Sequence, residues 1–377
     1  MIVAYKVQLI PNKEQIIQLQ KSAGVARFIY NWTLNKQQEN YKNGGKFIQD
    51  GKLRKELTQL KKTELQWLSE VSNDIAKQAV KDACDAYKRF FKKQSDFPQF
   101  KNKKKSKPSF YNDTFKIMVY KNHVQLAKLG KIKLAEHNRI PINTKYYNPR
   151  ITFDGLHWTL SVGVEELRAL NISKTESIGI DLGIKDLAVV STREVYKNIN
   201  KTKKIKKLKK RLKRQQKKAS KLYEKIKRKE IVTKSNNLKK LELQIKKTYK
   251  TMTNIRTNHI HQMTSKLVKA NPEYIVIEDL NVKGMIKNRH LARAIQEQKL
   301  YEVIRQITYK CEWYNVTLIK ANRWFPSSKT CYQCGYIKKD LNLSDRIYKC
   351  PCCGNVIDRD YQAALNLREY GKSYIIT

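Results

Sequence analysis

The chain has 377 residues, 40% of them hydrophobic, which is enough for two or three compact units with apolar cores. Its 79 Lys and Arg against 33 Asp and Glu give a formal net charge of +46, and this surplus predicts a polyanionic partner, nucleic acid. No apolar run approaches the roughly 18 residues that span a bilayer, and the N-terminus lacks a signal-peptide pattern, so we exclude a membrane protein and expect a cytoplasmic one.

The first part of the chain carries one strand signal and then helix signals. Residues 2–9 have strand character, and Asn12 with Gln15 forms the capping pair that begins a helix. Apolar residues at three- and four-residue steps predict two more helices, around 53–60 and 75–90. We therefore expect a helical unit after the first strand.

A basic loop with interleaved aromatic residues follows at 97–108. A charge run of this kind is commonly only a solvated face, but the aromatic residues and the net charge favour contact with phosphates. The candidate nucleic-acid-binding residues are Lys101, Lys103, Lys104, Lys105 and Lys107.

Strand signals then resume. We expect strands at 116–125 and 131–135, and a hairpin in which 150–153 and 157–162 flank a tight turn at Gly155. These segments predict a small antiparallel barrel, which the first strand joins across the helical insertion.

After a linker at 171–175 the pattern changes. Residues 178–183 are a buried-strand run interrupted by one acid, Asp181, and 187–191 read as the returning strand. From 201 to 250 the chain is rich in lysine and lacks Gly and Pro, with apolar residues at helical spacing and a break near Ser235. We interpret it as a basic helical hairpin.

The last third adds a second acidic strand and a helix. Residues 274–278 are apolar and end in Glu278, residues 291–313 predict one amphipathic helix, and 316–321 predict a short strand. Asp360 stands at the start of the final helix.

Asp181, Glu278 and Asp360 lie where strand or helix ends would bring them to one edge of a sheet. One buried acid is most simply a structural salt bridge, but three converging carboxylates repel each other and call for divalent cations. Oxygen ligands select Mg²⁺ or Mn²⁺, and two such ions would support phosphodiester cleavage. The pattern is typical of a nuclease.

Three neighbouring acids compete for these roles. Asp186 is expected to cap or face solvent, and Asp279 would point to the other side of its strand from Glu278. Asp358 and Asp360 share one helix entrance, and the residues alone leave that choice open.

Two paired cysteine motifs, C-x2-C-x15-C-x2-C, have the spacing of a structural zinc site. The expected ligands are Cys331, Cys334, Cys350 and Cys353. Four thiolates leave no open position for water, so the ion would support the fold. Cys352, inside the second motif, is interpreted as a spare, with register-shifted ligation as the alternative.

The motifs IGIDLGIKDLAVVS, YIVIEDLNVKGM, SSKTCYQCG and YKCPCCGNVIDRDYQAALNL occur in the order of the RuvC-like core of transposon-encoded TnpB proteins, compact relatives of type V CRISPR nucleases. The sequence resembles that family over nearly its whole length, with weaker similarity in the N-terminal half. The resemblance implies that Asp181, Glu278 and Asp360 are the catalytic acids, with Asp358 beside them. Gln362 and Asn258 depart from the family pattern, although neither replaces a metal ligand.

The resemblance also implies an α+β multidomain fold. It has a wedge-like β-barrel at 1–10 and 108–172, interrupted by a helical recognition domain at 11–107. An RNase H-like nuclease domain follows at 176–330 and 354–377, with the basic hairpin at 200–256 and a zinc ribbon at 331–353.

The implied function is RNA-guided DNA cleavage by two Mg²⁺ ions in the prokaryotic cytosol. The partners would be a guide RNA from the protein's own element and a double-stranded DNA target, with a monomer favoured. Two alternatives stay open: a transposase that performs strand transfer, and a non-catalytic nucleic-acid scaffold in which the three acids are structural.

Overall fold

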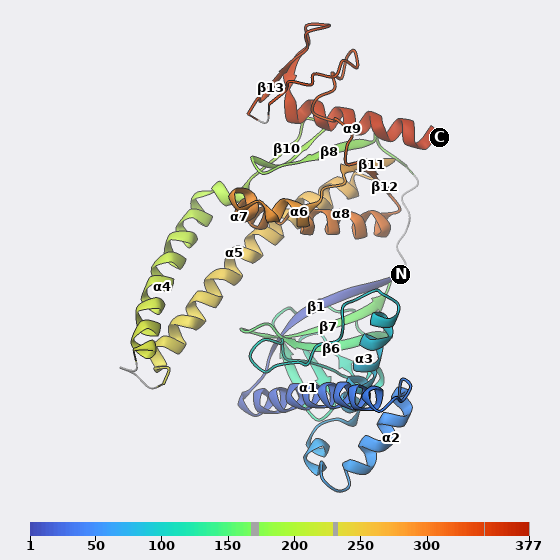
Figure 1. Ribbon diagram of the computed structural model, residues 1–377, viewed down its shortest axis with the longest axis vertical. Coiled ribbons are helices and arrows are strands. Elements are labelled where there is room, and N and C mark those ends of the chain that lie inside the picture. Colours follow the sequence, from blue (N-terminus) through green and yellow to red (C-terminus); the bar gives the residue numbers. More distant parts are fainter. Residues whose placement is uncertain (167–172, 229–232, 343, 377) are drawn as a thin grey trace. The chain divides into compact units, whose positions relative to one another are not determined.

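The computed structural model describes residues 1–166, 173–228, 233–342 and 344–376. The chain divides into two compact units, Met1–Leu167 and Arg168–Thr377, each described by itself below (Figure 1). The predicted linker at 171–175 lies partly outside the described residues. Within these ranges, no helix is long and apolar enough to cross a membrane.

The first unit is built on a seven-stranded sheet in the order β2-β6-β7-β1-β5-β4-β3, with antiparallel neighbours throughout. The strands are β1 (Ile2–Ile10), β2 (Ser109–Tyr111), β3 (Met118–Val119), β4 (His123–Leu126), β5 (Gly130–Leu134), β6 (Tyr146–Phe153) and β7 (Trp158–Glu165). As predicted, the first strand joins strands that follow the helical insertion, and it pairs with both β5 and β7.

The helices of this unit are α1 (Lys13–Lys42), α2 (Asp50–Leu60), the 3₁₀ turn η1 (Gln66–Glu70) and α3 (Asn73–Phe91). The predicted capping pair is confirmed, because the Asn12 side chain accepts from the Gln15 amide and the Gln15 side chain accepts from the Asn12 amide. The helices and the sheet share one apolar core, with fully buried Leu19, Ile29 and Ile132.

The single strand predicted at 116–125 is wrong. Asp113 caps a short 3₁₀ turn, η2 (Thr114–Lys116), by accepting from the Phe115 amide at 2.8 Å. The chain then turns back between β3 and β4, where the Tyr120 amide donates to the His123 carbonyl. Buried apolar residues lie on both sides of this turn, Ile117 and Val119 before it and Val124 after it, which is why the segment resembled one strand.

The second unit contains a five-stranded sheet in the order β10-β9-β8-β11-β12. The strands are β8 (Ile178–Leu182), β9 (Asp186–Val190), β10 (Val195–Lys197), β11 (Tyr274–Glu278) and β12 (Thr317–Ala321). The strands β8, β11 and β12 run parallel. At one edge of the sheet, β9 pairs antiparallel with β8, and β10 pairs antiparallel with β9.

The two faces of this sheet are covered by different helices (Figure 1). Ile180 and Ile277 belong to an apolar cluster completed by residues of α5 (Asn236–Lys269), α7 (Arg289–Gln298) and α8 (Leu300–Tyr314). The other face packs on α9 (Arg359–Ile376), where Val276 of the sheet meets Leu367 of the helix. Side chains alternate along a strand, so neighbouring residues serve opposite faces.

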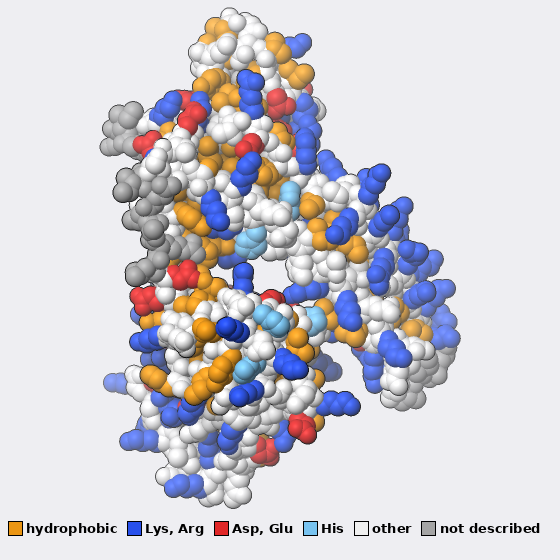
Figure 2. Space-filling view, turned by 180° about the vertical axis from the view of Figure 1, so that it is seen from behind, with side chains coloured by type: hydrophobic (Ala, Val, Ile, Leu, Met, Phe, Trp, Pro, Cys, Tyr) orange, Lys and Arg blue, Asp and Glu red, His pale blue; other side chains and the backbone are white. Residues whose placement is uncertain are grey.

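The predicted basic hairpin is confirmed. It consists of α4 (Lys203–Lys227) and α5, and Ser235 caps α5 by accepting from the Leu238 amide. A small apolar seam that includes Leu212 and Met252 joins the helices. Lys and Arg side chains cover much of the visible hairpin surface (Figure 2).

The one helix predicted at 291–313 is two helices, α7 and α8. They are separated by Lys299, whose backbone is left-handed with φ of 57°. The Lys299 side chain donates to the Thr257 hydroxyl at 2.7 Å. No Gly or Pro marks this break, so apolar periodicity alone could not reveal it. A further short helix, α6 (Val282–Lys287), precedes them.

Candidate functional site

Asp181 and Glu278 lie at the carboxyl edge of the five-stranded sheet. The strands β8 and β11 pair in parallel up to Ile180 and Ile277, and the two acids are the next residues on each strand. Parallel neighbours place in-register residues side by side and on the same face. The sheet thus brings together two acids that are 97 positions apart in the chain.

This shared face is the one that α9 covers. A Cβ atom built on Gly179 would lie 2.1 Å from the Ala364 carbonyl oxygen, so α9 lies directly on the glycine. Asp181 is two residues further along the same strand and faces the same way. Asp360, in the first turn of α9, is close enough to this edge for its charge to act on Asp181. The three sequence-predicted acids therefore converge.

The proximity of the three acids affects the pKa of Asp181. Burial, followed by the charges of Glu278 and Asp360, raises the pKa of Asp181 well above its ordinary value. The Arg359 guanidinium opposes this effect only in part. A carboxyl group in this position is costly to ionise without a nearby cation.

Two of the acids have defined partners. The Ser327 hydroxyl donates to Glu278 Oε1 at 2.6 Å, and Arg346 Nη1 lies 3.8 Å from Asp360 Oδ2. Ser327 is held in turn, because Asn366 of α9 donates to the Ser327 carbonyl oxygen at 2.7 Å. The edge is thus organised by the loop after β12 and by α9.

The competing acids are engaged elsewhere. Asp358 Oδ1 accepts from the backbone amides of Asp360 and Tyr361, so it caps α9. Asp279 pairs with Arg323 at 2.9 Å. Asp186 lies 3.6 Å from Lys197 on the neighbouring strand β10.

A groove of about 580 Å³ opens beside the acids, between β9, β10 and the start of α9. Its charged and aromatic lining is Lys185, Asp186, Arg193, Lys197, Asp358, Asp360 and Tyr361. Arg193 occupies a left-handed backbone position, with φ of 68°, at the turn between β9 and β10. Its guanidinium donates to the Tyr361 hydroxyl at 3.2 Å, and this contact links the turn to α9.

The four predicted cysteine ligands come together. Cys331 and Cys353 sulfurs are 3.6 Å apart, and so are those of Cys334 and Cys350. A tetrahedral zinc ion with Zn–S bonds of about 2.3 Å separates its sulfurs by roughly 3.8 Å, so the cluster can hold zinc. Cys352 is exposed and lies outside the cluster, as predicted.

Local backbone geometry explains this arrangement. Gly335 and Gly354 have φ of 75° and 73°, and each amide donates to the carbonyl of the first cysteine of its motif. The strands β13 (Ile347–Lys349) and β14 (Val356–Asp358) pair behind the cluster, and β14 leads directly into α9. The donor atoms of the four cysteines all lie within 4.8 Å of one another. Among the described residues, Asp181, Glu278 and Asp360 do not form so tight a group.

The basic loop of the first unit divides into two parts. Lys101 is half-buried, with its ammonium 3.7 Å from the Tyr30 ring centre, and burial lowers the pKa of Lys101. The other four predicted lysines are exposed: Lys103, Lys104, Lys105 and Lys107. Lys101 is therefore part of the packing, whereas the others are accessible.

Two polar residues near this edge, Ser327 and Gln362, were not predicted as site residues from the sequence. Gln362 is fully buried, its Oε1 accepts from the Tyr332 amide at 3.4 Å, and its Nε2 has no partner in the part of the chain described here. It therefore contacts the zinc-ribbon segment. The polar residues before Cys331 were the sequence feature from which Ser327 could have been predicted.

Comparison with known proteins identifies the family. Family models described as "Helix-turn-helix domain", "Probable transposase" and "Cas12f1-like, TNB domain" match residues 1–46, 161–289 and 301–367. A Streptomyces pristinaespiralis protein named "Putative RNA-guided DNA endonuclease" is 31% identical over 98% of this chain and 89% of its own length. The mimivirus TnpB-like protein L770 is 30% identical over 52% of this chain and 37% of its own length.

The chain belongs to the TnpB family. Another relative, Escherichia coli InsQ, also named a "Putative RNA-guided DNA endonuclease", is 29% identical over 99% of this chain and 93% of its own length. Among solved structures, a Cas12f1–sgRNA–target DNA complex matches with a TM-score of 0.58 at 15% identity, covering 95% of this chain and 83% of that chain. This likeness places the TnpB-family chain in the Cas12f1 fold, a mixed α/β architecture.

Proposed function

We propose that the protein is a transposon-encoded, RNA-guided DNA endonuclease in which Asp181, Glu278 and Asp360 hold two Mg²⁺ ions. The observation that carries the proposal is geometric: Asp181 and Glu278 lie side by side on the paired parallel strands β8 and β11, and their proximity to Asp360 is consistent with the raised pKa of Asp181. Carboxylate oxygens suit Mg²⁺ or Mn²⁺, and cations at this edge would relieve the repulsion. When bound, such ions activate a water and stabilise the leaving 3′ oxygen of a phosphodiester.

The protein's own residues would orient these ligands. Ser327 donates to Oε1 of Glu278, and the other carboxylate oxygen would be available to a metal ion. Asp358 fixes the first turn of α9 and so directs Asp360 towards the sheet edge. Arg346, 3.8 Å from Asp360, would release this carboxylate to a metal ion.

The groove beside the acids would hold the DNA strand that is cut. Its cations Lys185, Arg193 and Lys197 can contact phosphates, and Tyr361 offers an aromatic ring. Asp360 lines the same groove, so a strand bound there passes a proposed metal ligand.

The partners follow from charge and from the relatives. The names of the relatives specify an RNA guide and a DNA target, and the net charge of +46 suits both. We propose a guide RNA from the same element, a double-stranded DNA target, and action as a monomer. Exposed Lys103, Lys104, Lys105 and Lys107 are proposed phosphate contacts.

The five-stranded sheet with its acidic edge supports an RNase H-like, RuvC-type nuclease domain at 176–330 and 354–377. The zinc ribbon at 331–353 would be structural, and the hairpin at 200–256 would belong to the nuclease domain. In the first unit we propose a wedge-like barrel at 1–10 and 108–172 around a helical recognition domain at 11–107.

The test is cleavage of guide-matched DNA by purified protein with its own element's RNA. Mg²⁺ should be required, and Asp181→Asn, Glu278→Gln and Asp360→Asn should each abolish cutting while RNA binding persists. Asp279→Asn is the matched control, since Asp279 adjoins Glu278 but pairs with Arg323, and it should retain activity. Undiminished cutting by the three variants would refute the site.

Strand transfer is a second candidate, favoured by the family description "Probable transposase" for residues 161–289. It needs a 3′-hydroxyl nucleophile and joins donor DNA to target DNA. Joined products in the same reaction would support it, whereas simple breaks support the endonuclease.

A further inference from the structure

A second cavity, about 780 Å³ in volume, lies between α4, α5 and α7 of the second unit, and Asp181, Glu278 and Asp360 are not among its lining residues. Its charged lining is Lys209, Lys210, Lys213, Arg256, Arg293 and Glu297. Five cations thus surround one carboxylate, which leaves a strong positive potential in a confined space.

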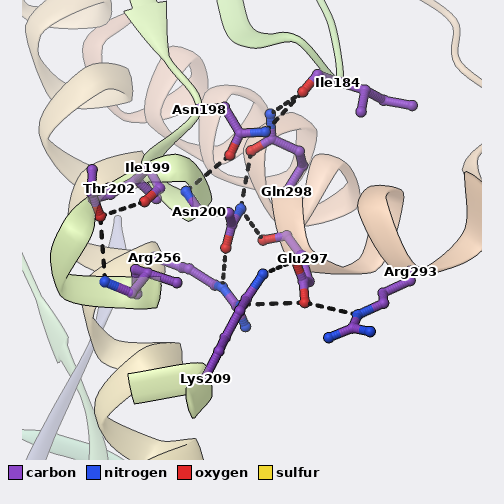
Figure 3. A network of polar contacts seen from close by, with 11 residues as sticks. Ile184, Asn198, Ile199, Asn200, Thr202, Lys209, Arg256, Arg293, Glu297 and Gln298 are labelled. Atoms are coloured by element: carbon purple, nitrogen blue, oxygen red, sulfur yellow. Dashed lines mark hydrogen bonds and ion pairs between the residues drawn. The ribbon is translucent and has the colours of Figure 1, made fainter. Parts of the chain in front are cut away.

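Glu297 occupies the place of an anionic ligand. Its carboxylate lies 2.5 Å from Lys209 Nζ, 3.3 Å from Arg293 Nε and 3.9 Å from Arg256 Nη2 (Figure 3). Burial alone would raise the pKa of Glu297, but the bond and charge of Lys209 hold this pKa below its ordinary value. The carboxylate therefore stays ionised and shares three cations that a phosphate could also bind.

The remaining wall is suited to a nucleobase. Leu212 and Met252 are buried and form an apolar floor. Tyr249 is 47% exposed, and its hydroxyl accepts from Gln216 Nε2 at 2.8 Å, which fixes the ring at the cavity edge. Stacking on an exposed aromatic ring is the usual way in which proteins hold single-stranded bases.

Buried amides fix the back of the cavity. Arg256 Nε donates to Asn200 Oδ1 at 2.7 Å, and Asn200 Nδ2 donates to the Glu297 carbonyl at 3.1 Å (Figure 3). Gln298, which is 3% exposed, donates to the carbonyl oxygen of Ile184, in the turn after β8, at 3.1 Å. The site is thus anchored to the sheet, unlike a loose patch of surface lysines.

We propose that this cavity binds one nucleotide of a single-stranded nucleic-acid segment, with the phosphate on Lys209 and Arg293 and the base on Tyr249. The phosphate displaces Glu297 from these cations, so Glu297 weakens binding and makes it selective for a ligand with stronger negative charge. The site is independent of the nuclease chemistry at the acidic edge.

The direction in which one substitution changes nucleic-acid affinity separates this proposal from a purely structural role of the network. Binding of a labelled twelve-nucleotide uridine RNA, and of its thymidine DNA counterpart, is measured by fluorescence anisotropy without divalent metal. Glu297→Gln should tighten binding by about threefold to tenfold, because it removes the competing anion. Glu242→Gln is the matched control: it makes the same charge change on α5, at a residue paired with Lys234 outside the cavity.

A second pair of variants tests stacking. Tyr249→Leu should weaken binding roughly fivefold to a hundredfold, the range expected for one stacked base. Tyr223→Leu is its control, since Tyr223 is 42% exposed on the same hairpin but does not line the cavity. If a tyrosine variant fails to fold, a lysine pair replaces it. Lys213 lines the cavity, so Lys213→Gln should weaken binding more than the same change at exposed Lys221, which does not line it.

Equal effects within these pairs, or weaker binding by Glu297→Gln, would overturn the proposal. The nucleic acid whose binding depends on Tyr249 identifies the source, guide RNA or displaced DNA. Because no metal is present, a negative result here leaves the cleavage test unaffected, and the reverse also holds.

Discussion

The two faces of the five-stranded sheet differ although neighbouring residues of one strand supply both. Ile180 is fully buried in the apolar cluster under α5, α7 and α8. Asp181, the next residue, faces α9 and meets Glu278 and Asp360 at the sheet edge. The apolar face stabilises the fold. The face under α9 carries buried acids that lower stability, as is common at functional sites.

The largest expected effect is on Asp181. Asp181→Asn should reduce DNA cleavage about 10³-fold or more, since a metal ligand is lost. The raised pKa means that the ionised carboxylate destabilises the folded protein at neutral pH, so the amide should raise the melting temperature in metal-free buffer.

Ile180→Ala should do the opposite, with stability lower by about 2–4 kcal/mol and cleavage retained by the folded fraction. Parallel melting and cleavage assays check both.

The cysteine cluster tests whether the ribbon supports the α9 face. Cys350→Ser removes a sulfur that lies 3.6 Å from Cys334, so zinc should be lost and the ribbon should unfold, because metal binding and folding are coupled. Exposed Cys352→Ser is the control and should keep one zinc per chain. Elemental analysis and proteolysis report the result; a zinc-free parent with an intact ribbon would contradict the assignment.

A smaller effect is expected at the contact between the sheet and α9. An alanine Cβ at Gly179 would lie 2.1 Å from the Ala364 carbonyl and 2.5 Å from the Arg368 amide, and helix backbone cannot yield without moving α9. Gly179→Ala should cost about 1–3 kcal/mol of stability and lower cleavage, because Asp360 shifts with the helix. Gly51→Ala, with no atom within 4 Å, should be neutral or slightly stabilising.

The smallest effect concerns the apolar face, where Lys310 is 4% exposed and donates to Thr264, Ser265 and the His261 carbonyl. Burial, with a minor contribution from Lys269, lowers the pKa of Lys310 to about 8. The unfolded chain therefore holds this proton more tightly, and stability should rise as pH increases from 8 towards 10.5. Lys310→Met should flatten that rise in denaturant titrations; an unchanged slope would contradict it.

Much of the candidate site could be predicted because its signals are local. Single acids in apolar strands singled out Asp181 and Glu278, and cysteine spacing gave the cluster. The hydrogen bond from Ser327 to Glu278 and the contact between Arg193 and Tyr361 join distant segments, so no periodicity reveals them. The helix break at Lys299 was missed for the same reason, since its cause is tertiary.

The central claim is that the three acids share divalent metal ions. Titration of the RNA-bound protein with Mn²⁺, followed by electron paramagnetic resonance, tests it without relying on cleavage. We expect two Mn²⁺ ions per chain in the parent and in Asp279→Asn, and loss of tight binding in Glu278→Gln and Asp360→Asn. Unchanged stoichiometry and affinity in the last two variants would contradict the account.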